Sequence, residues 1–162
     1  MHRIWLHALC FSLAGCNGPS LPAGPSMQQA RPSLEQIVAN DRWSLAEGTH
    51  DDKPLLIRFR EELRARPEVT TLPLLVRVVW NFDTDATGMP DGEAGDAMEV
   101  FENRLVHAVE PDRIAVLTAV VTHDGDREWL FYTADIAAFA RRLTDMPQEP
   151  ERYPIEISVE RD

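Results

Sequence analysis

The sequence contains little cysteine and little positive charge. Its 162 residues include two cysteines, and Lys53 is the only lysine among 16 basic residues, against 27 acidic ones. The formal net charge is −11 at pH 7. A surface of this sign repels nucleic acid, whose phosphates bind to clustered Lys and Arg side chains. We therefore predict no nucleic-acid partner.

Long apolar runs are also absent. A helix that spans a membrane needs about 20 apolar residues, and no stretch of this chain reaches that length. The N-terminus instead has a basic start at Arg3, an apolar run of about 10 residues and small residues before Cys16. This layout is typical of an export signal and predicts that the protein leaves the cytoplasm.

The segment LAGC, Leu13–Cys16, resembles the lipobox of bacterial lipoproteins. In these proteins the cysteine thiol receives a diacylglyceryl group and the signal is cut before it. The resemblance implies a signal peptide at residues 1–15 and a lipidated Cys16 that anchors the protein in a membrane, on the periplasmic or cell-surface side. Cys10 would leave with the signal, so we expect no disulfide in the mature protein.

The residues after Cys16 lack any hydrophobic period. Residues 17–33 are rich in Pro, Gly, Ser and Gln, a composition typical of linkers. We predict a flexible tether over residues 16–40, with a short helical turn near its end. One α+β domain is then expected at residues 41–162, a length that suffices for one core.

Hydrophobic periodicity predicts the elements of that domain. The expected order is a hairpin within 42–60, strand 73–82, helix 96–110, strands 113–122 and 127–133, helix 136–146 and strand 153–160. After the hairpin this order is βαββαβ, which predicts a ferredoxin-like sandwich with both helices on one face of an antiparallel sheet. The hairpin would add two strands to the sheet or form a flap.

Apolar stripes predict which side chains are buried. The expected core residues are Met98, Phe101, Leu105 and Val109 on the first helix, Ile136, Phe139, Leu143 and Met146 on the second, and Ile155, Ile157 and Val159 on the last strand. In strand 127–133, period 2 buries either Trp129 with Phe131 or Leu130 with Tyr132, and the pattern fits both choices.

Six segments of the domain resemble a bacterial family, the domain of unknown function 695. They are RWSLAEG, KPLLIRFR, GMP, MEVFENRL, VVTHDGDREWLFYT and YPIEI, in this order and spacing over residues 42–162. The family has no established reaction. It is distantly similar to the inhibitor-B type regulators of ribonuclease E, which implies a ferredoxin-like fold and a binding role.

Catalytic motifs are missing from the sequence. It contains neither G-x-S-x-G nor H-E-x-x-H, and we predict no catalytic residue and no cofactor. The acidic loop 83–96 partly matches a calcium loop, but Ala94 stands where a bidentate glutamate is required. We therefore predict no metal site; the weak candidate ligands are Asp83, Asp85, Asp91 and Glu93. A hydrolase or metal-dependent enzyme that uses this loop is the alternative function.

The sheet face opposite the helices is the predicted partner-binding surface. Alternation places polar and aromatic side chains there, and such mixed surfaces suit protein recognition. The candidate residues are Arg77, Asn81 and Glu156, together with Trp129 or Tyr132, whichever of these two is not buried. Taken together, the sequence predicts a lipid-anchored envelope protein that binds another envelope protein and has no catalytic machinery.

The lipobox generates the first testable prediction. Protein extracted from membranes should begin at Cys16 and carry the additional mass of its acyl chains, because a single chain anchors only marginally and lipoproteins carry several. Intact mass spectrometry measures both features. The Cys16→Ser variant should remain in the soluble fraction. A soluble, unmodified wild-type chain that begins elsewhere would contradict the prediction.

Overall fold

Six strands and three α-helices make up the folded unit, seen in a computed structural model that describes residues 34–63 and 71–161. The predicted signal, Cys16 and most of the tether lie outside these residues. The elements are α1 (Leu34–Asn40), β1 (Trp43–His50), β2 (Lys53–Arg60), β3 (Leu74–Asn81), α2 (Gly92–Val109), β4 (Ala115–His123), β5 (Asp126–Thr133), α3 (Ile136–Asp145) and β6 (Ile155–Arg161).

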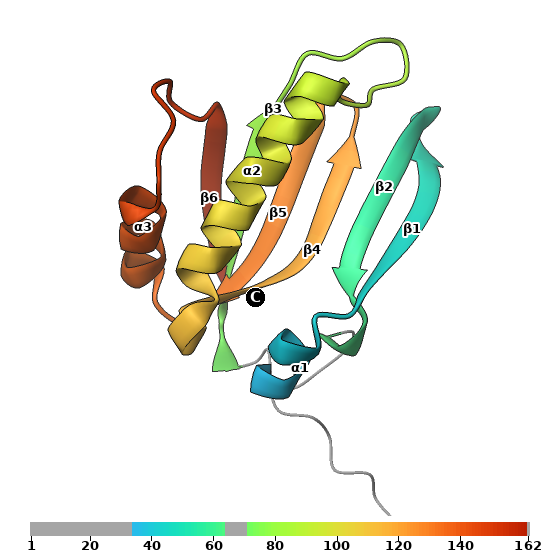
Figure 1. The fold of residues 1–162 in the computed structure, drawn as a ribbon. Helices are drawn as coiled ribbons and strands as arrows, with labels where there is room; N and C mark the ends of the chain where they lie inside the picture. The colour runs from blue at the N-terminus through green and yellow to red at the C-terminus, as the bar shows by residue number, and fades with distance from the viewer. Residues whose placement is uncertain (1–33, 64–70, 162) are drawn as a thin grey trace, which may run out of the picture. The chain divides into compact units, whose positions relative to one another are not determined.

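The strands form a single antiparallel sheet in the order β1-β2-β4-β5-β3-β6. Helices α2 and α3 lie on the same side of it (Figure 1). The predicted α+β class and the N-terminal hairpin are thus confirmed. The hairpin does not cover a face of the sheet, since β2 pairs with β4 and extends the sheet sideways.

Two tight turns set the register of the hairpins. Asp51 and Asp52, with φ of 49° and 62°, join β1 to β2. Asp124 and Gly125, with φ of 44° and 88°, join β4 to β5. Two-residue hairpin turns of type I′ require positive φ at both central positions, which Asp and Gly tolerate better than most residues. The first turn lies within the hairpin predicted at residues 42–60, and the second lies between the strands predicted at residues 113–122 and 127–133.

Side-chain caps begin both long helices. The carboxylate of Asp91 accepts a hydrogen bond from the Ala94 N–H, and that of Asp135 accepts one from the Ala138 N–H, which satisfies one of the free donors of each first turn. Because Asp91 caps α2, the helix begins at Gly92. The predicted start at residue 96 is wrong by one helical turn, and the acidic loop is correspondingly shorter.

The main core lies between the two helices and the sheet. All four residues of the predicted α2 stripe are fully buried, as is Phe139 of α3. Trp129 and Phe131 are also fully buried, which decides the choice left open by the sequence. The ring of Phe101 packs against the ring of Trp129, with centroids 5.1 Å apart.

A second, smaller cluster lies on the other face of the sheet. Ile37 of α1, which is 2 % exposed, packs there with Leu63, Leu72 and Val116. Helix α1 is therefore part of the folded unit. The predicted tether over residues 16–40 is too long at its C-terminal end, since burial of Ile37 holds residues 34–40 on the domain.

The last strand departs from the predicted burial pattern. Ile157 and Val159 of β6 share the helix-side face with the buried Val78 and Val76, to which they are paired. Both are nevertheless 44 % exposed. The prediction that these two residues are buried is wrong, because β6 is an edge strand and its neighbours cover this face incompletely.

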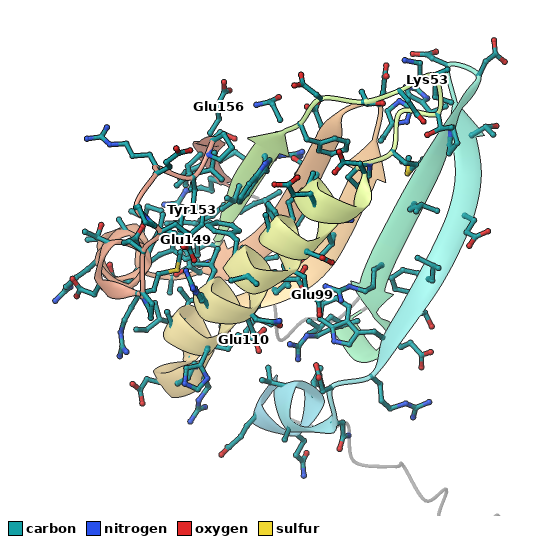
Figure 2. All side chains as sticks on the ribbon, turned by 45° about the horizontal axis from the view of Figure 1, so that its top comes forward. Lys53, Glu99, Glu110, Glu149, Tyr153 and Glu156 are labelled. Carbon is teal, nitrogen blue, oxygen red and sulfur yellow. The ribbon has the colours of Figure 1, made fainter. Side chains whose placement is uncertain are left out.

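A buried ion pair joins β2 to the end of α2. The Nη2 of Arg60 donates to both carboxylate oxygens of Glu110, at 2.8 and 2.9 Å, and these side chains are 3 % and 9 % exposed. Glu110, labelled in Figure 2, also accepts the Leu117 N–H. Burial raises the pKa of Glu110, and attraction to Arg60 offsets this only in part. The pair is thus costly to bury but more costly to break.

This pair generates the second prediction. Glu110→Ala should lower the free energy of unfolding by about 3–5 kcal/mol, because it leaves a buried guanidinium without its main partner. Thermal unfolding should then shift by about 10 °C or more. The double variant Arg60→Met with Glu110→Leu should recover most of the loss, since apolar replacement of a buried pair is often neutral. A loss below about 1 kcal/mol for Glu110→Ala would contradict the prediction.

Candidate functional site

Three of the predicted binding residues lie together on the sheet face away from the helices. Arg77 and Asn81 lie on the same side of β3, with Val79 between them. Glu156 of β6 is paired with Val79. Arg77 donates to Glu128 at 2.8 Å and to Glu160 at 3.1 Å, and the hydrogen bonds to Glu128 and Glu160 raise its pKa. Its guanidinium is therefore engaged within the sheet rather than free for a partner.

The two aromatic residues of the predicted face have other positions. Trp129 lies on the opposite face, fully buried, where its Nε1 donates to Glu102 at 2.8 Å, so its assignment to an exposed surface is wrong. Tyr132 is on the predicted face but packs against the second cluster beneath α1. This face consequently has no exposed aromatic anchor from either residue.

The acidic loop is shaped by its own hydrogen bonds. Asp85 accepts from the N–H and the hydroxyl of Thr87, which lowers the pKa of Asp85. Asp91 caps α2, and the N–H of Gly125 donates to Gly88, whose φ is 75°. Among the described residues, no three His, Cys, Asp or Glu side chains gather closely enough to hold a metal ion. The candidate ligands of the loop are not brought together.

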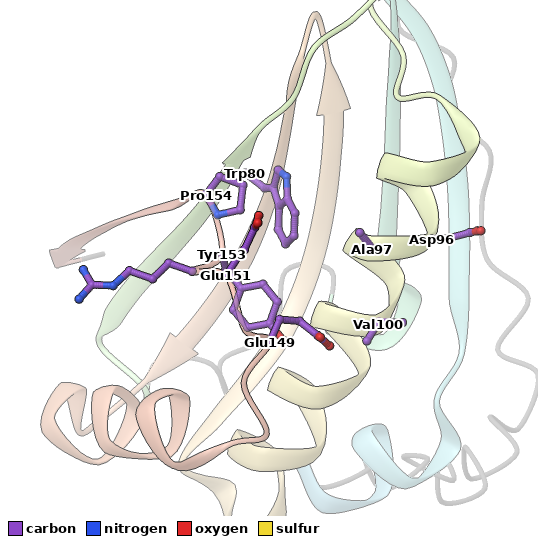
Figure 3. A pocket seen from close by; sticks show the side chains of 9 residues that line it. Trp80, Asp96, Ala97, Val100, Glu149, Glu151, Tyr153 and Pro154 are labelled. Carbon is purple, nitrogen blue, oxygen red and sulfur yellow. The ribbon is translucent and has the colours of Figure 1, made fainter.

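An apolar cleft lies between α2 and the segment that precedes β6 (Figure 3). Its volume is about 390 Å³, within the range of about 300–1,000 Å³ common for ligand pockets. Trp80 and Tyr153 line the side next to the sheet, and Ala97 and Val100 line the side next to the helix. Val100 is 44 % exposed although it is a large apolar residue of α2.

Polar contacts hold the segment before β6, one wall of this cleft, in place. Arg104 of α2 donates to the Tyr153 hydroxyl at 2.7 Å and pairs with Glu149 at 2.5 Å; Figure 2 shows Tyr153 and Glu149 next to each other. The Tyr153 ring contacts the rings of Phe101 and Trp80, with centroids 4.8 and 5.8 Å apart. The cleft is therefore preformed.

The cleft continues along β6 as a row of apolar side chains. Ile155, Ile157 and Val159 follow Pro154, a residue of the cleft, on the helix side of the strand. Glu156 and Glu160 alternate with them on the other side. β6 pairs with β3 alone in the sheet formed by the described residues. We call β6 together with the cleft the edge surface.

Sequence reasoning identified the alternation of β6 but missed the edge surface. The available signal was the long connection between helix 136–146 and strand 153–160, in which Pro147, Pro150 and Pro154 prevent further regular structure. A connection of this kind predicts that the second helix does not run the length of the last strand.

No helix within the described parts of the chain is both long and apolar enough to cross a membrane. The fold and the edge surface together define an α+β domain that combines one antiparallel sheet with an open strand and an apolar cleft.

The model of the family of unknown function DUF695 matches residues 41–162, and the chain belongs to this family. This confirms the resemblance found in the sequence. No curated protein and no solved structure matches the chain.

The arrangement of the acidic loop generates the third prediction. Melting temperatures in millimolar calcium and in chelator should agree within about 1 °C, because Ala94 cannot ligate and Asp91 is already engaged as a cap. Scanning calorimetry with magnesium as the control ion measures this. A calcium-specific rise of several degrees would show that the loop binds the ion.

Proposed function

We propose that this protein is a lipid-anchored envelope protein and that it binds a partner protein, one strand of which pairs with β6 and extends the sheet. The carrying observation is the exposure of Ile157 and Val159, both 44 %, on an edge strand beside an apolar cleft. An edge strand offers unpaired backbone groups, and exposed apolar side chains on it promote pairing with another chain. Strand addition uses both features at once.

We further propose that β3-α2-β4-β5-α3-β6 is a ferredoxin-like unit. Its support is the order β4-β5-β3-β6 within the sheet and the position of α2 and α3 on one side. In this arrangement β6 is an edge strand by topology. The partner surface is then a property of the fold and not of one side chain.

The chemistry of the edge surface specifies the partner strand. On the helix side it would place apolar side chains beside Ile157 and Val159, with one more in the cleft near Trp80. On the other side it would meet Glu156 and Glu160, within a chain of net charge −11. Opposite charges across paired strands are favourable. The expected partner is therefore an extended segment that alternates apolar and basic residues.

Charge also argues against a second copy of this chain as the partner. In an antiparallel pairing of two β6 strands centred on Ser158, Glu156 of each copy would lie opposite Glu160 of the other. Like charges directly opposite each other destabilise a strand pair. A basic partner removes this repulsion.

Synthetic peptides test the proposal, in the fourth prediction. An eight-residue peptide that alternates valine and lysine should bind the full chain and slow hydrogen exchange at β6 amides, because added backbone hydrogen bonds protect them. A peptide that alternates valine and glutamate is the charge control and should not bind. Affinity should fall with added salt, since the contacts with Glu156 and Glu160 are exposed.

Matched variants at the two edges of the sheet locate the site. Ile157→Glu should weaken binding of the valine–lysine peptide by about tenfold or more, because it places a charge among the apolar contacts. Leu45→Glu makes the same change on β1, where Leu45 is 59 % exposed, and should leave affinity unchanged. Equal effects of the two variants, or protection at β1 and not at β6, would contradict the proposal.

A further inference from the structure

A second concave site lies on the opposite flank of α2, away from the edge surface. The hairpin carries the sheet sideways beyond the helix, and a groove of about 550 Å³ separates α2 from β2, β4 and β5. We call it the hairpin groove. Its apolar lining is Leu45, Leu56 and Val120, and its polar lining is Arg58, Glu99, Glu102, Asn103, Thr122 and Arg127. Figure 2 labels Glu99 on this flank of the helix.

Arg127 is the distinctive side chain of the hairpin groove. It is half-buried, and its Nε donates to the Thr122 hydroxyl at 3.1 Å. A guanidinium carries five N–H donors, and within the described residues Arg127 forms no ion pair with a carboxylate. Burial lowers the pKa of Arg127, because desolvation disfavours its charged form. Arg127 lines the groove, and its hydrogen bond to Thr122 uses only one of its five donors.

The nearby carboxylate of Glu102 is already occupied. One oxygen accepts the Trp129 Nε1–H at 2.8 Å, and the other accepts a hydrogen bond from Arg58. Arg58 is further held by stacking, since its guanidinium carbon lies 4.7 Å from the centre of the Trp43 ring. Glu102 therefore fixes Arg58 in position, and among the described residues no carboxylate forms an ion pair with Arg127.

The guanidinium groups of Arg58 and Arg127 line the same groove and repel each other. Attraction to Glu102 raises the pKa of Arg127, and the positive charge of Arg58 lowers it by a smaller amount. Two cations that line one groove lose this repulsion when an anion binds between them, and a carboxylate matches the planar fork of arginine with two parallel hydrogen bonds.

We propose that the hairpin groove binds a small molecule that joins a carboxylate to an apolar body, with the carboxylate on Arg127 and Arg58. The apolar body lies against Leu45, Leu56 and Val120. A monoanion suits the groove better than a phosphate dianion, because Glu99 and Glu102 line the same space. The hairpin groove is separate from the edge surface, so either of the two binding proposals could be wrong while the other is right.

N-acetyl-leucine is a suitable probe, and N-acetyl-leucinamide is its uncharged counterpart. The full chain is labelled with nitrogen-15, and each indole N–H resonance is assigned by a Trp→Phe variant. Trp43 and Trp129 report on the hairpin groove through Arg58 and Glu102, and Trp80 reports on the cleft. The acid should shift the first two resonances in a saturable way and leave that of Trp80 unchanged.

Ligand charge and one side chain should control the affinity. The amide should bind about tenfold more weakly or worse, since it cannot form charge-assisted hydrogen bonds. Arg127→Gln should weaken binding of the acid by a similar factor, and Arg127→Lys by less, because lysine keeps the charge without the fork. Arg77→Gln, an arginine change on the other sheet face, is the matched control and should bind normally.

The Arg127→Gln variant should fold, because Arg127 forms no ion pair with a carboxylate of the described residues that the change would break. Arg127→Leu should melt at or above the wild-type temperature, since it removes the cost of burying a charge, and it provides a second binding-deficient variant. Equal binding of acid and amide, unchanged binding by Arg127→Gln, or a shift confined to Trp80 would each overturn the proposal.

Discussion

The coverage of six strands by two helices is the constraint from which both candidate sites follow. Two helices side by side are about 20 Å across, whereas the outer strands of a six-stranded sheet are about 24 Å apart and carry side chains beyond that. Apolar faces of α2 and α3 bury the middle of the sheet. At the β6 flank, α3 does not run the length of the strand and leaves the cleft, and at the other flank the hairpin extends beyond α2 and leaves the hairpin groove. The same core packing thus creates a mainly apolar hollow and a charged one.

The hairpin is attached to the rest of the domain by charge as well as by backbone pairing. Arg58 and Arg60 are two residues apart on β2 and point to the same side. Arg58 pairs with Glu102 of α2, and Arg60 pairs with Glu110, the C-terminal cap of that helix. Trp43 of β1 lies against both guanidinium groups, at 4.7 and 4.8 Å. Arg60 is buried and would be costly without Glu110, whereas Arg58 is 41 % exposed and is held by Glu102 and by Trp43. The position of the hairpin, and with it the groove, depends on these contacts.

Short sequence patterns predicted the helices, strands and turns, but they could not predict contacts between segments that are distant in the sequence. The apolar stripe of α2, the start of α3 at Ile136 and the hairpin of β4 and β5 each depend on a few adjacent residues, and all were predicted. The burial of Trp129 over Tyr132 depends on which face the helices cover, and the exposure of Ile157 depends on the strand order. Periodicity gives two faces but does not say how much of each is covered. Both hollows were missed for this reason, although β6 itself was placed correctly.

Helix α1 has a mechanical consequence for a chain anchored at Cys16, as proposed. Of its side chains whose burial is described, residues 35–40, Ile37 alone is buried in the small cluster, and α1 is the first described element after the proposed tether. A pull between membrane and domain would load this contact before any strand of the sheet, and one apolar side chain resists with only about 2 kcal/mol. Release of the seven residues of α1 would lengthen the connection by about 13 Å, the difference between helical and extended chain. With the proposed anchor, the helix would be a weak link that yields under load and leaves the sheet and both of its hollows intact.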